Sequence, residues 1–155
     1  DREQFEAAGL HILAESDQAG VHLAASADRF RIIFFQGHPE YDTISLFKEY
    51  KREVARFIKG EHADYPPFPE NYFSLITEAI LEEHRDWLLA SKARGAPLPD
   101  LPESIVIPSL DNTWHDTAEA VINNWIGKVY QVTNNDRKKP FQDGIDPNDP
   151  LGLRK

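Results

Sequence analysis

The residues best placed to do chemistry are a histidine and a glutamate two positions apart, His38 and Glu40. In extended backbone, residues i and i+2 point to the same side, so the glutamate can hydrogen-bond one imidazole nitrogen. That bond sets the tautomer and stabilises the imidazolium, and the other ring nitrogen then acts as a general base. The pair is the histidine–carboxylate half of a nucleophilic triad. The structural alternative is that His38 starts a turn and Glu40 is a solvated charge.

No nucleophile accompanies this pair in the sequence. The chain has no cysteine, so thiol nucleophiles, Cys-based metal sites and disulfides are excluded within it. Thr43 and Ser45 are close in sequence, but we expect both to serve the first turn of a helix. Because the chain also lacks methionine and begins at Asp1, we expect it to be the C-terminal part of a longer protein.

A second pair, Glu49 and Arg52, is three residues apart on a predicted helix and therefore shares one face. An arginine can fork onto a carboxylate and a glutamate can receive an ammonium group, which together would bind an amino acid. The alternative is a surface ion pair of little energetic consequence. The six histidines include no i, i+4 pair with a glutamate, so we expect no bound metal.

Predicted strands and helices position these groups. Strands are expected at 9–15, 21–25 and 30–35, and the short link between the last two predicts a hairpin. Ile32–Phe35 shows no polar alternation, which predicts a central strand with both faces covered. Apolar residues at three- and four-residue spacing predict helices at 43–59, 74–94 and 113–132. Asp42 or Thr43 would cap the first helix, and the last would carry a buried stripe that includes Trp125 and Ile126.

Composition and charge narrow the class of protein. The apolar fraction of 41% and the charged fraction of 28% in 155 residues are ordinary for one globular domain. The net charge of −9 without a dense Lys/Arg block argues against nucleic acid and anionic membranes as partners. No apolar run approaches the roughly 18 residues of a membrane helix. We therefore expect a soluble, cytoplasmic protein.

Several collinear motifs resemble the homoserine O-acyltransferase family, also called homoserine O-succinyltransferase or transsuccinylase. The most specific are Gly-His-Pro-Glu-Tyr-Asp at 37–42 and Glu-Tyr-Lys-Arg at 49–52. Shorter pieces lie before and after these motifs in the right order, at 15–23, 69–73, 112–114, 123–126 and 129–131. The resemblance thus covers roughly residues 9 to 132.

The resemblance implies a class I glutamine amidotransferase-like, flavodoxin-like α/β layered sheet, of which this chain is the C-terminal portion. It also implies transfer of a succinyl or acetyl group from acyl-CoA, through a cysteine, to the hydroxyl of L-homoserine in methionine biosynthesis. Acyl-CoA would be a co-substrate, and no bound cofactor is expected. The N-terminal half of the enzyme would supply the cysteine, and a homodimer is expected.

The resemblance also assigns roles to four residues. His38 matches the catalytic histidine of the family and Glu40 its triad carboxylate. Arg52 matches the arginine that holds the homoserine carboxylate, and Glu49 the glutamate beside it. These are the roles that the residue types and spacings suggest by themselves.

We expect residues 1–133 to be the C-terminal half of the acyltransferase domain, with a helical insertion at 74–106. Residues 134–155 are expected to form an extended or mobile tail. Two other functions stay open at this point. A class I glutamine amidotransferase uses the same Cys–His–Glu arrangement to hydrolyse glutamine, and a non-catalytic interaction module derived from this fold would need no nucleophile.

Overall fold

The computed structural model describes residues 2–154, and they form two compact units. The first unit comprises the residues up to Glu40 and those from Trp114 onwards, and the second comprises Tyr41–Thr113. The chain therefore leaves the first unit after residue 40 and returns to it at residue 114. Each unit is described below by itself.

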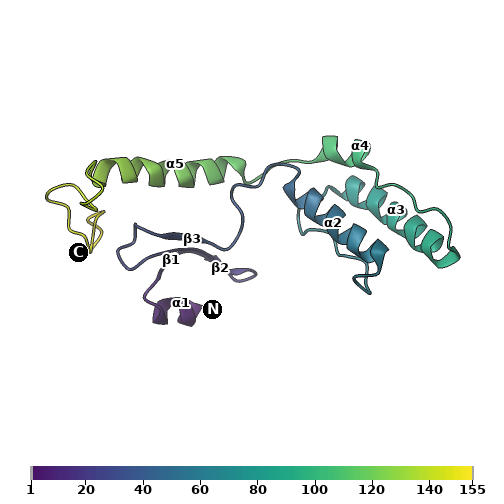
Figure 1. Ribbon diagram of the computed structural model, residues 1–155, viewed down its shortest axis with the longest axis horizontal. Helices are drawn as coiled ribbons and strands as arrows, with labels where there is room; N and C mark the ends of the chain where they lie inside the picture. The colour runs from purple at the N-terminus through teal and green to yellow at the C-terminus, as the bar shows by residue number, and fades with distance from the viewer. Residues whose placement is uncertain (1, 155) are drawn as a thin grey trace. The chain divides into compact units, whose positions relative to one another are not determined.

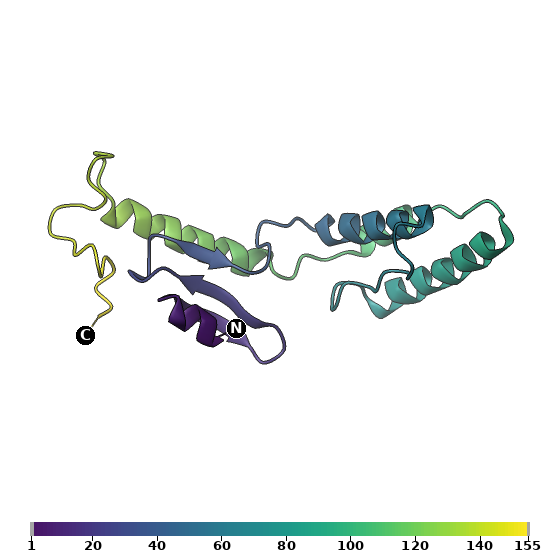
Figure 2. The same ribbon diagram turned by 60° about the horizontal axis from the view of Figure 1, so that its bottom comes forward.

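The first unit is built on a three-stranded antiparallel sheet in the order β1-β2-β3. Its strands are β1 (His11–Ser16), β2 (Gly20–Ala25) and β3 (Ile33–Phe35), and its helices are α1 (Arg2–Ala7) and α5 (His115–Val132). Figures 1 and 2 show α1 and α5 on opposite sides of the sheet. The predicted hairpin is confirmed, since Leu23 pairs with Phe35 and Ala25 with Ile33.

A buried aspartate shapes the loop of this hairpin. Asp28 accepts hydrogen bonds from the Ser26 hydroxyl at 2.6 Å and from the backbone N–H groups of Phe30 and Arg31, each at 3.1 Å. The Arg31 side chain forms an ion pair with the same carboxylate. Such Asx-type hydrogen bonds let one side chain direct several residues of a turn.

The prediction that Ile32–Phe35 is a central strand with both faces covered is wrong for the described residues. β3 is three residues long and lies at the edge of the sheet. Ile32 is 54% exposed and Phe34 is 41% exposed. A continuous apolar run indicates that both faces of a strand are suited to burial. It does not indicate which other segment of the protein covers those faces.

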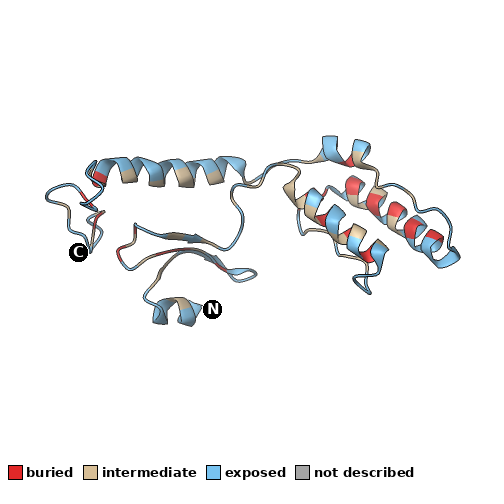
Figure 3. Cartoon of the chain, in the orientation of Figure 1, coloured by how far each residue is buried: buried red, intermediate tan, exposed pale blue. Residues whose placement is uncertain are grey.

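The prediction that the apolar residues of α5 form a buried stripe is also wrong in part. Val121, Ile122 and Trp125 are half-buried and Ile126 is exposed, so burial is complete only at Val132. Within α5, Figure 3 shows the red of buried residues only at the C-terminal end. There Val132 packs with Phe30 and Phe141. Among the described residues after α5, 133–154, none lies in a helix or strand, and Phe141 packs this segment against the rest of the first unit.

The second unit is helical and has its own core. It contains α2 (Ser45–Lys59), α3 (Leu75–Arg94), the short α4 (Glu103–Val106) and the 3-10 turn η1 (Ile107–Ser109). The side chains of α2 that recur at helical spacing are buried, and those of Phe47 and Tyr50 lie against the ring of Phe73. Leu81 and Leu88 of α3 are also fully buried. Aromatic rings from the proline-rich connector complete this core, with Tyr50 5.6 Å from Phe68 and 5.7 Å from Phe73 between ring centroids.

The ends of α2 and α3 confirm the predicted helices at 43–59 and 74–94 to within two residues. Ser74 caps α3 by accepting from the Thr77 N–H at 3.2 Å, and Gly60 and Gly95 end the two helices in the left-handed conformation that glycine adopts without strain. Helix α2 begins later than expected. Asp42 lies before it and accepts from the Ile44 N–H at 3.1 Å and the Ser45 hydroxyl at 2.8 Å.

The protein is therefore α/β, with a small antiparallel sheet and separate helices. The domain boundaries predicted at 133 and the insertion predicted at 74–106 stay predictions. Within residues 2–154, no helix combines the length and apolar character that crossing a membrane requires.

Candidate active site

The structure brings His38 and Glu40 into direct contact. His38 Nδ1 lies 2.7 Å from Glu40 Oε1, and both side chains are exposed. Because an ionised carboxylate can only accept, Nδ1 carries the hydrogen and donates it. The second ring nitrogen, Nε2, is then the atom with the basic lone pair.

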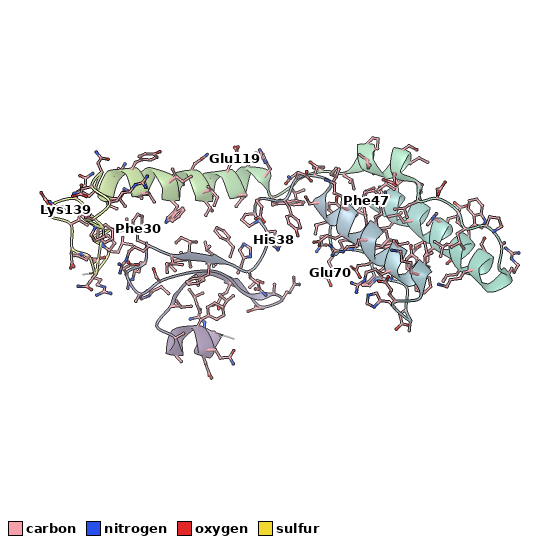
Figure 4. The ribbon with its side chains drawn as sticks, in the orientation of Figure 1. Phe30, His38, Phe47, Glu70, Glu119 and Lys139 are labelled. Atoms are coloured by element: carbon pink, nitrogen blue, oxygen red, sulfur yellow. The ribbon has the colours of Figure 1, made fainter. Side chains whose placement is uncertain are left out.

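The end of β3 places this pair. The Gln36 N–H donates to the His22 carbonyl at 2.9 Å, which extends the β2–β3 pairing by one residue. A Cβ added at Gly37 would lie 3.3 Å from His22 Cε1, so the His22 ring covers the backbone there. His38 follows directly, just beyond the sheet (Figure 4). Gly37 thus allows a close approach between the turn and β2.

The contact also acts on the glutamate electrostatically. The hydrogen bond from His38 is the main cause that holds the pKa of Glu40 below its ordinary value. Glu40 therefore stays ionised and accepting throughout the neutral range. An exposed pair of this kind contributes little to stability, so its consequence is the orientation of the imidazole.

The second predicted pair, Glu49 and Arg52, is further apart than His38 and Glu40. Arg52 lies 4.0 Å from Glu49, at the limit of an ion pair, and its Nε donates instead to Glu53 at 3.1 Å. Glu49 accepts from the Tyr41 hydroxyl at 2.8 Å. Arg52 is exposed on α2 and Glu49 is half-buried there, with its carboxylate still accessible to a ligand. His38 and Glu40 belong to the first unit and Glu49 and Arg52 to the second, so the structure establishes each pair separately.

Known proteins match nearly the whole chain. A sequence model described as homoserine O-succinyltransferase matches residues 1–135. The chain belongs to the homoserine O-succinyltransferase family. The homoserine O-succinyltransferase of Nitrosococcus oceani is 62% identical over 154 residues, which cover 99% of this chain and 43% of that protein. The protein of the same name from Allochromatium vinosum is 63% identical over 150 residues, with 97% and 42% covered.

A more distant homoserine O-succinyltransferase, from Cardiobacterium hominis, is 43% identical over 149 residues, which cover 96% of this chain and 41% of that protein. The chain thus spans about two fifths of the length of the curated relatives that it matches. The resemblance read from the motifs is confirmed at the level of the family.

The sequence pattern did not point to two further polar residues of the chain. Tyr41 belongs to the Gly-His-Pro-Glu-Tyr-Asp motif and holds Glu49 eight residues later. Asn112 donates from Nδ2 to the Tyr41 carbonyl at 3.3 Å. Tyr41 could have been noticed from its place in the motif, whereas the contact with Asn112 joins residues too far apart in sequence for any spacing rule.

The histidines and carboxylates of the described residues were compared with the arrangement that a metal ion requires. Among residues 2–154, no three His, Asp or Glu side chains converge in a way that could hold an ion. Of the scattered histidines, His62 lies 3.5 Å from Glu53 and His115 lies 3.7 Å from Glu119. These are single surface contacts with one carboxylate each, and neither suggests a metal centre.

Proposed function

We propose that this chain supplies the general base and the substrate-binding arginine of a homoserine O-acyltransferase. The observation that carries the proposal is the 2.7 Å contact between His38 Nδ1 and Glu40 Oε1 in a member of the homoserine O-succinyltransferase family. In the longer polypeptide, a succinyl or acetyl group would pass from acyl-CoA to a cysteine and then to the hydroxyl of L-homoserine, a step towards methionine.

In the first half-reaction, His38 Nε2 takes the proton of the cysteine thiol. The thiolate attacks the thioester carbonyl, a new thioester forms, and coenzyme A leaves as a thiolate that recovers the proton from His38. The cysteine must lie outside this chain, which has none. Glu40 stabilises the imidazolium that exists between the two proton transfers.

In the second half-reaction, His38 takes the proton of the homoserine hydroxyl. The alkoxide attacks the acyl-cysteine, the ester bond forms, and the cysteine thiolate leaves and is protonated by His38. The same nitrogen thus serves both halves, first as base and then as acid. This requires one stable ring orientation, which the bond to Glu40 provides.

Arg52 and Glu49 would bind the amino acid that carries this hydroxyl. The terminal nitrogens of Arg52 can fork onto the homoserine carboxylate while its Nε keeps the bond to Glu53. Glu49, oriented by Tyr41, would receive the ammonium group. The charges are thus of the right sign for both ends of a zwitterion.

Three further features belong to the same proposal. The complete enzyme would have a class I glutamine amidotransferase-like layered sheet, to which β1–β3 contribute. It would act in the cytoplasm and as a homodimer. These features were implied by the resemblance to the homoserine O-acyltransferase family, and the chain's membership of the homoserine O-succinyltransferase family supports them.

The test uses the full-length polypeptide that contains this chain. His38→Ala should lower kcat for acyl-CoA-dependent homoserine acylation by about 10²–10⁴-fold, the usual contribution of a general base. His115→Ala is the matched control, because His115 is an exposed histidine paired with a carboxylate, and it should act like wild type. Normal turnover in His38→Ala would refute the proposal, and glutaminase activity without acylation would favour the amidotransferase.

Arg52→Ala in the same polypeptide should raise the KM for homoserine by about 10- to 150-fold, since one charge-assisted bidentate contact is lost. The KM for acyl-CoA should change little. Arg56→Ala is the control, because Arg56 lies on the same helix and contacts Glu53 and Glu61. An unchanged homoserine KM in Arg52→Ala removes this residue from the site.

A further inference from the structure

Glu53 is a half-buried carboxylate of α2 with three basic neighbours. It accepts from Arg52 Nε at 3.1 Å, which is the shortest of these contacts. Arg56 Nη1 donates to it at 3.3 and 3.4 Å, and His62 Nε2 lies 3.5 Å away. The hydrogen bond from Arg52 is also the main cause that holds the pKa of Glu53 below its ordinary value. Glu53 is therefore ionised at neutral pH, and Arg52 is its closest partner.

The contact between Arg52 and Glu53 is not the one that helical spacing favours. Neighbouring residues point about 100° apart around an α-helix, whereas residues three apart lie on one face. Glu49, three positions before Arg52, is thus the carboxylate that the spacing offers to the arginine. In the structure, Arg52 bonds to Glu53 instead and stays 4.0 Å from Glu49, beyond hydrogen-bonding distance. Glu53 thus competes with Glu49 for the same guanidinium.

This competition matters for a substrate that carries both charges. An amino acid can bring its carboxylate to Arg52 and its ammonium group to Glu49 only while these two side chains are not paired with each other. A closed pair between Arg52 and Glu49 would have to break before each homoserine molecule could bind. Glu49 accepts from the Tyr41 hydroxyl at 2.8 Å. Each of the two charged groups therefore has a separate partner within the chain.

We propose that Glu53 is a positioning residue for the amino-acid substrate. It draws the Arg52 guanidinium away from Glu49, so that both charged groups stay open to homoserine. The bond uses Nε of the arginine and leaves to the substrate the two terminal nitrogens that fork onto a carboxylate. Glu53 acts through Arg52 and has no contact with the reacting atoms. The inference rests on the substrate-binding roles proposed above for Arg52 and Glu49.

A purely structural role for Glu53 predicts a different result. Glu53 and Arg56 are three residues apart and form an ion pair, which stabilises α2 independently of Arg52. Arg56→Ala removes this pair and leaves the bond between Arg52 and Glu53 in place. Arg56→Ala should therefore keep the wild-type KM for homoserine, whereas Glu53→Ala should raise it. Equal increases in the two variants would assign Glu53 to the stability of the helix and overturn the positioning role.

Steady-state kinetics of the full-length polypeptide measure the effect. Glu53→Ala should raise the KM for homoserine by about 2- to 10-fold, the scale of exposed charge contacts, with kcat and the KM for acyl-CoA unchanged. A loss of folded protein would instead lower the apparent kcat and leave the KM as it is. An unchanged homoserine KM in Glu53→Ala would overturn the proposal.

Two further variants show whether the carboxylate itself is responsible. Asp86→Ala is the matched control, because Asp86 accepts from Nε of its neighbour Arg85 at 3.3 Å on α3, and it should keep the wild-type KM. Glu53→Gln retains an oxygen that can accept from Arg52 but loses the charge. Its homoserine KM should lie between those of wild type and Glu53→Ala. A KM for Glu53→Gln above that of Glu53→Ala would contradict a role based on this bond.

A double-mutant cycle tests whether Glu53 acts through Arg52. In the Arg52→Ala background, Glu53→Ala should not raise the homoserine KM further, because the guanidinium that it positions is absent. A further rise of the same size would show that Glu53 acts by another route and would overturn the proposal. If Arg52→Ala alone leaves the KM unchanged, the proposed role of Arg52 fails, and this inference fails with it. If Arg52→Ala raises the KM and Glu53→Ala does not, only this inference fails.

Discussion

At the scale of single residues, two carboxylates are held in opposite ways. Glu40 is exposed and has one strong partner, His38, so its bond orients a side chain and adds little stability. Asp28 is 5% exposed and accepts from two backbone amides, a hydroxyl and an arginine. Burial by itself would raise the pKa of Asp28, but the hydrogen bonds from Ser26 and Arg31 outweigh it and hold the pKa well below its ordinary value.

This arrangement predicts that Asp28 stabilises the fold in a pH-dependent way. Its pKa is lower in the folded than in the unfolded chain, where it is about 3.9, so its contribution is present above that pH. The contribution is lost as the pH falls from about 4 towards the folded pKa. Asp28→Asn should cost about 1–3 kcal/mol at pH 6, the value of a hydrogen-bonded charge.

Urea unfolding of wild type and Asp28→Asn at pH 6 and at pH 3 checks this expectation. The difference in unfolding free energy should shrink at the lower pH, because at pH 3 the unfolded chain binds a proton at Asp28 that the folded chain does not bind, which favours unfolding of the wild type. Asp143→Asn is the control, since Asp143 is an exposed carboxylate with one surface ion pair. A difference that is the same at both pH values would contradict the role given to the charge.

At the scale of elements, the helices of the second unit depend on contacts between neighbours. Lys92 of α3 donates from Nζ to the carbonyls of Phe57 and Ile58 at 2.8 and 3.0 Å. These carbonyls lie in the last turn of α2, where the i+4 amide donors are missing, and the Phe57 carbonyl also accepts from the Gly60 N–H at 3.0 Å. The ammonium also lies 4.5 Å from the centroid of the Phe57 ring. One side chain of α3 thus completes the C-terminus of α2.

We predict that Lys92→Met lowers the free energy of unfolding by about 1–3 kcal/mol, since methionine keeps the apolar stem but removes the charged donor. Lys48→Met is the matched control, because Lys48 is exposed on α2 with one distant carboxylate, and it should change stability by less than about 0.5 kcal/mol. Thermal unfolding followed by circular dichroism measures both. Equal midpoints for Lys92→Met and wild type would mean that the cap contributes nothing.

At the scale of the whole molecule, the two units differ in how their chain segments are arranged. The second unit is one continuous segment, Tyr41–Thr113, whereas the first combines segments from both ends of the chain. The core of the second unit is contained within it, through residues such as Phe47, Leu81 and Leu88. The first unit depends on Phe30 meeting Val132 and Phe141, which are about a hundred residues further along the chain.

We therefore predict that residues 41–113 fold as an isolated fragment, whereas residues 1–40 do not. The longer fragment should melt cooperatively and show the near-ultraviolet circular dichroism of packed aromatic rings, since its ring contacts are all internal. The shorter fragment has a sheet without α5 to pack on it, and isolated small sheets are marginal in water. Non-cooperative melting of 41–113 would show that its core needs the rest of the polypeptide.

The local features of the chain follow from its amino-acid sequence alone. The contact between His38 and Glu40 and the ends of the helices near residues 59 and 94 depend on residues within a few positions, so spacing and residue type are sufficient to predict them. The hairpin of β2 and β3 and the three long helices follow for the same reason. The collinear motifs around residues 37–52 were enough to assign the family.

Contacts between residues far apart along the chain could be seen only in the folded structure. Tyr41 on Glu49, Lys92 on the end of α2, and Phe141 on Phe30 depend on how separate segments pack, and no periodicity encodes that. The same reason explains the two wrong predictions for Ile32–Phe35 and α5. An apolar pattern states that a surface is suited to burial, whereas burial itself requires a partner, and the structure shows where the described residues supply one.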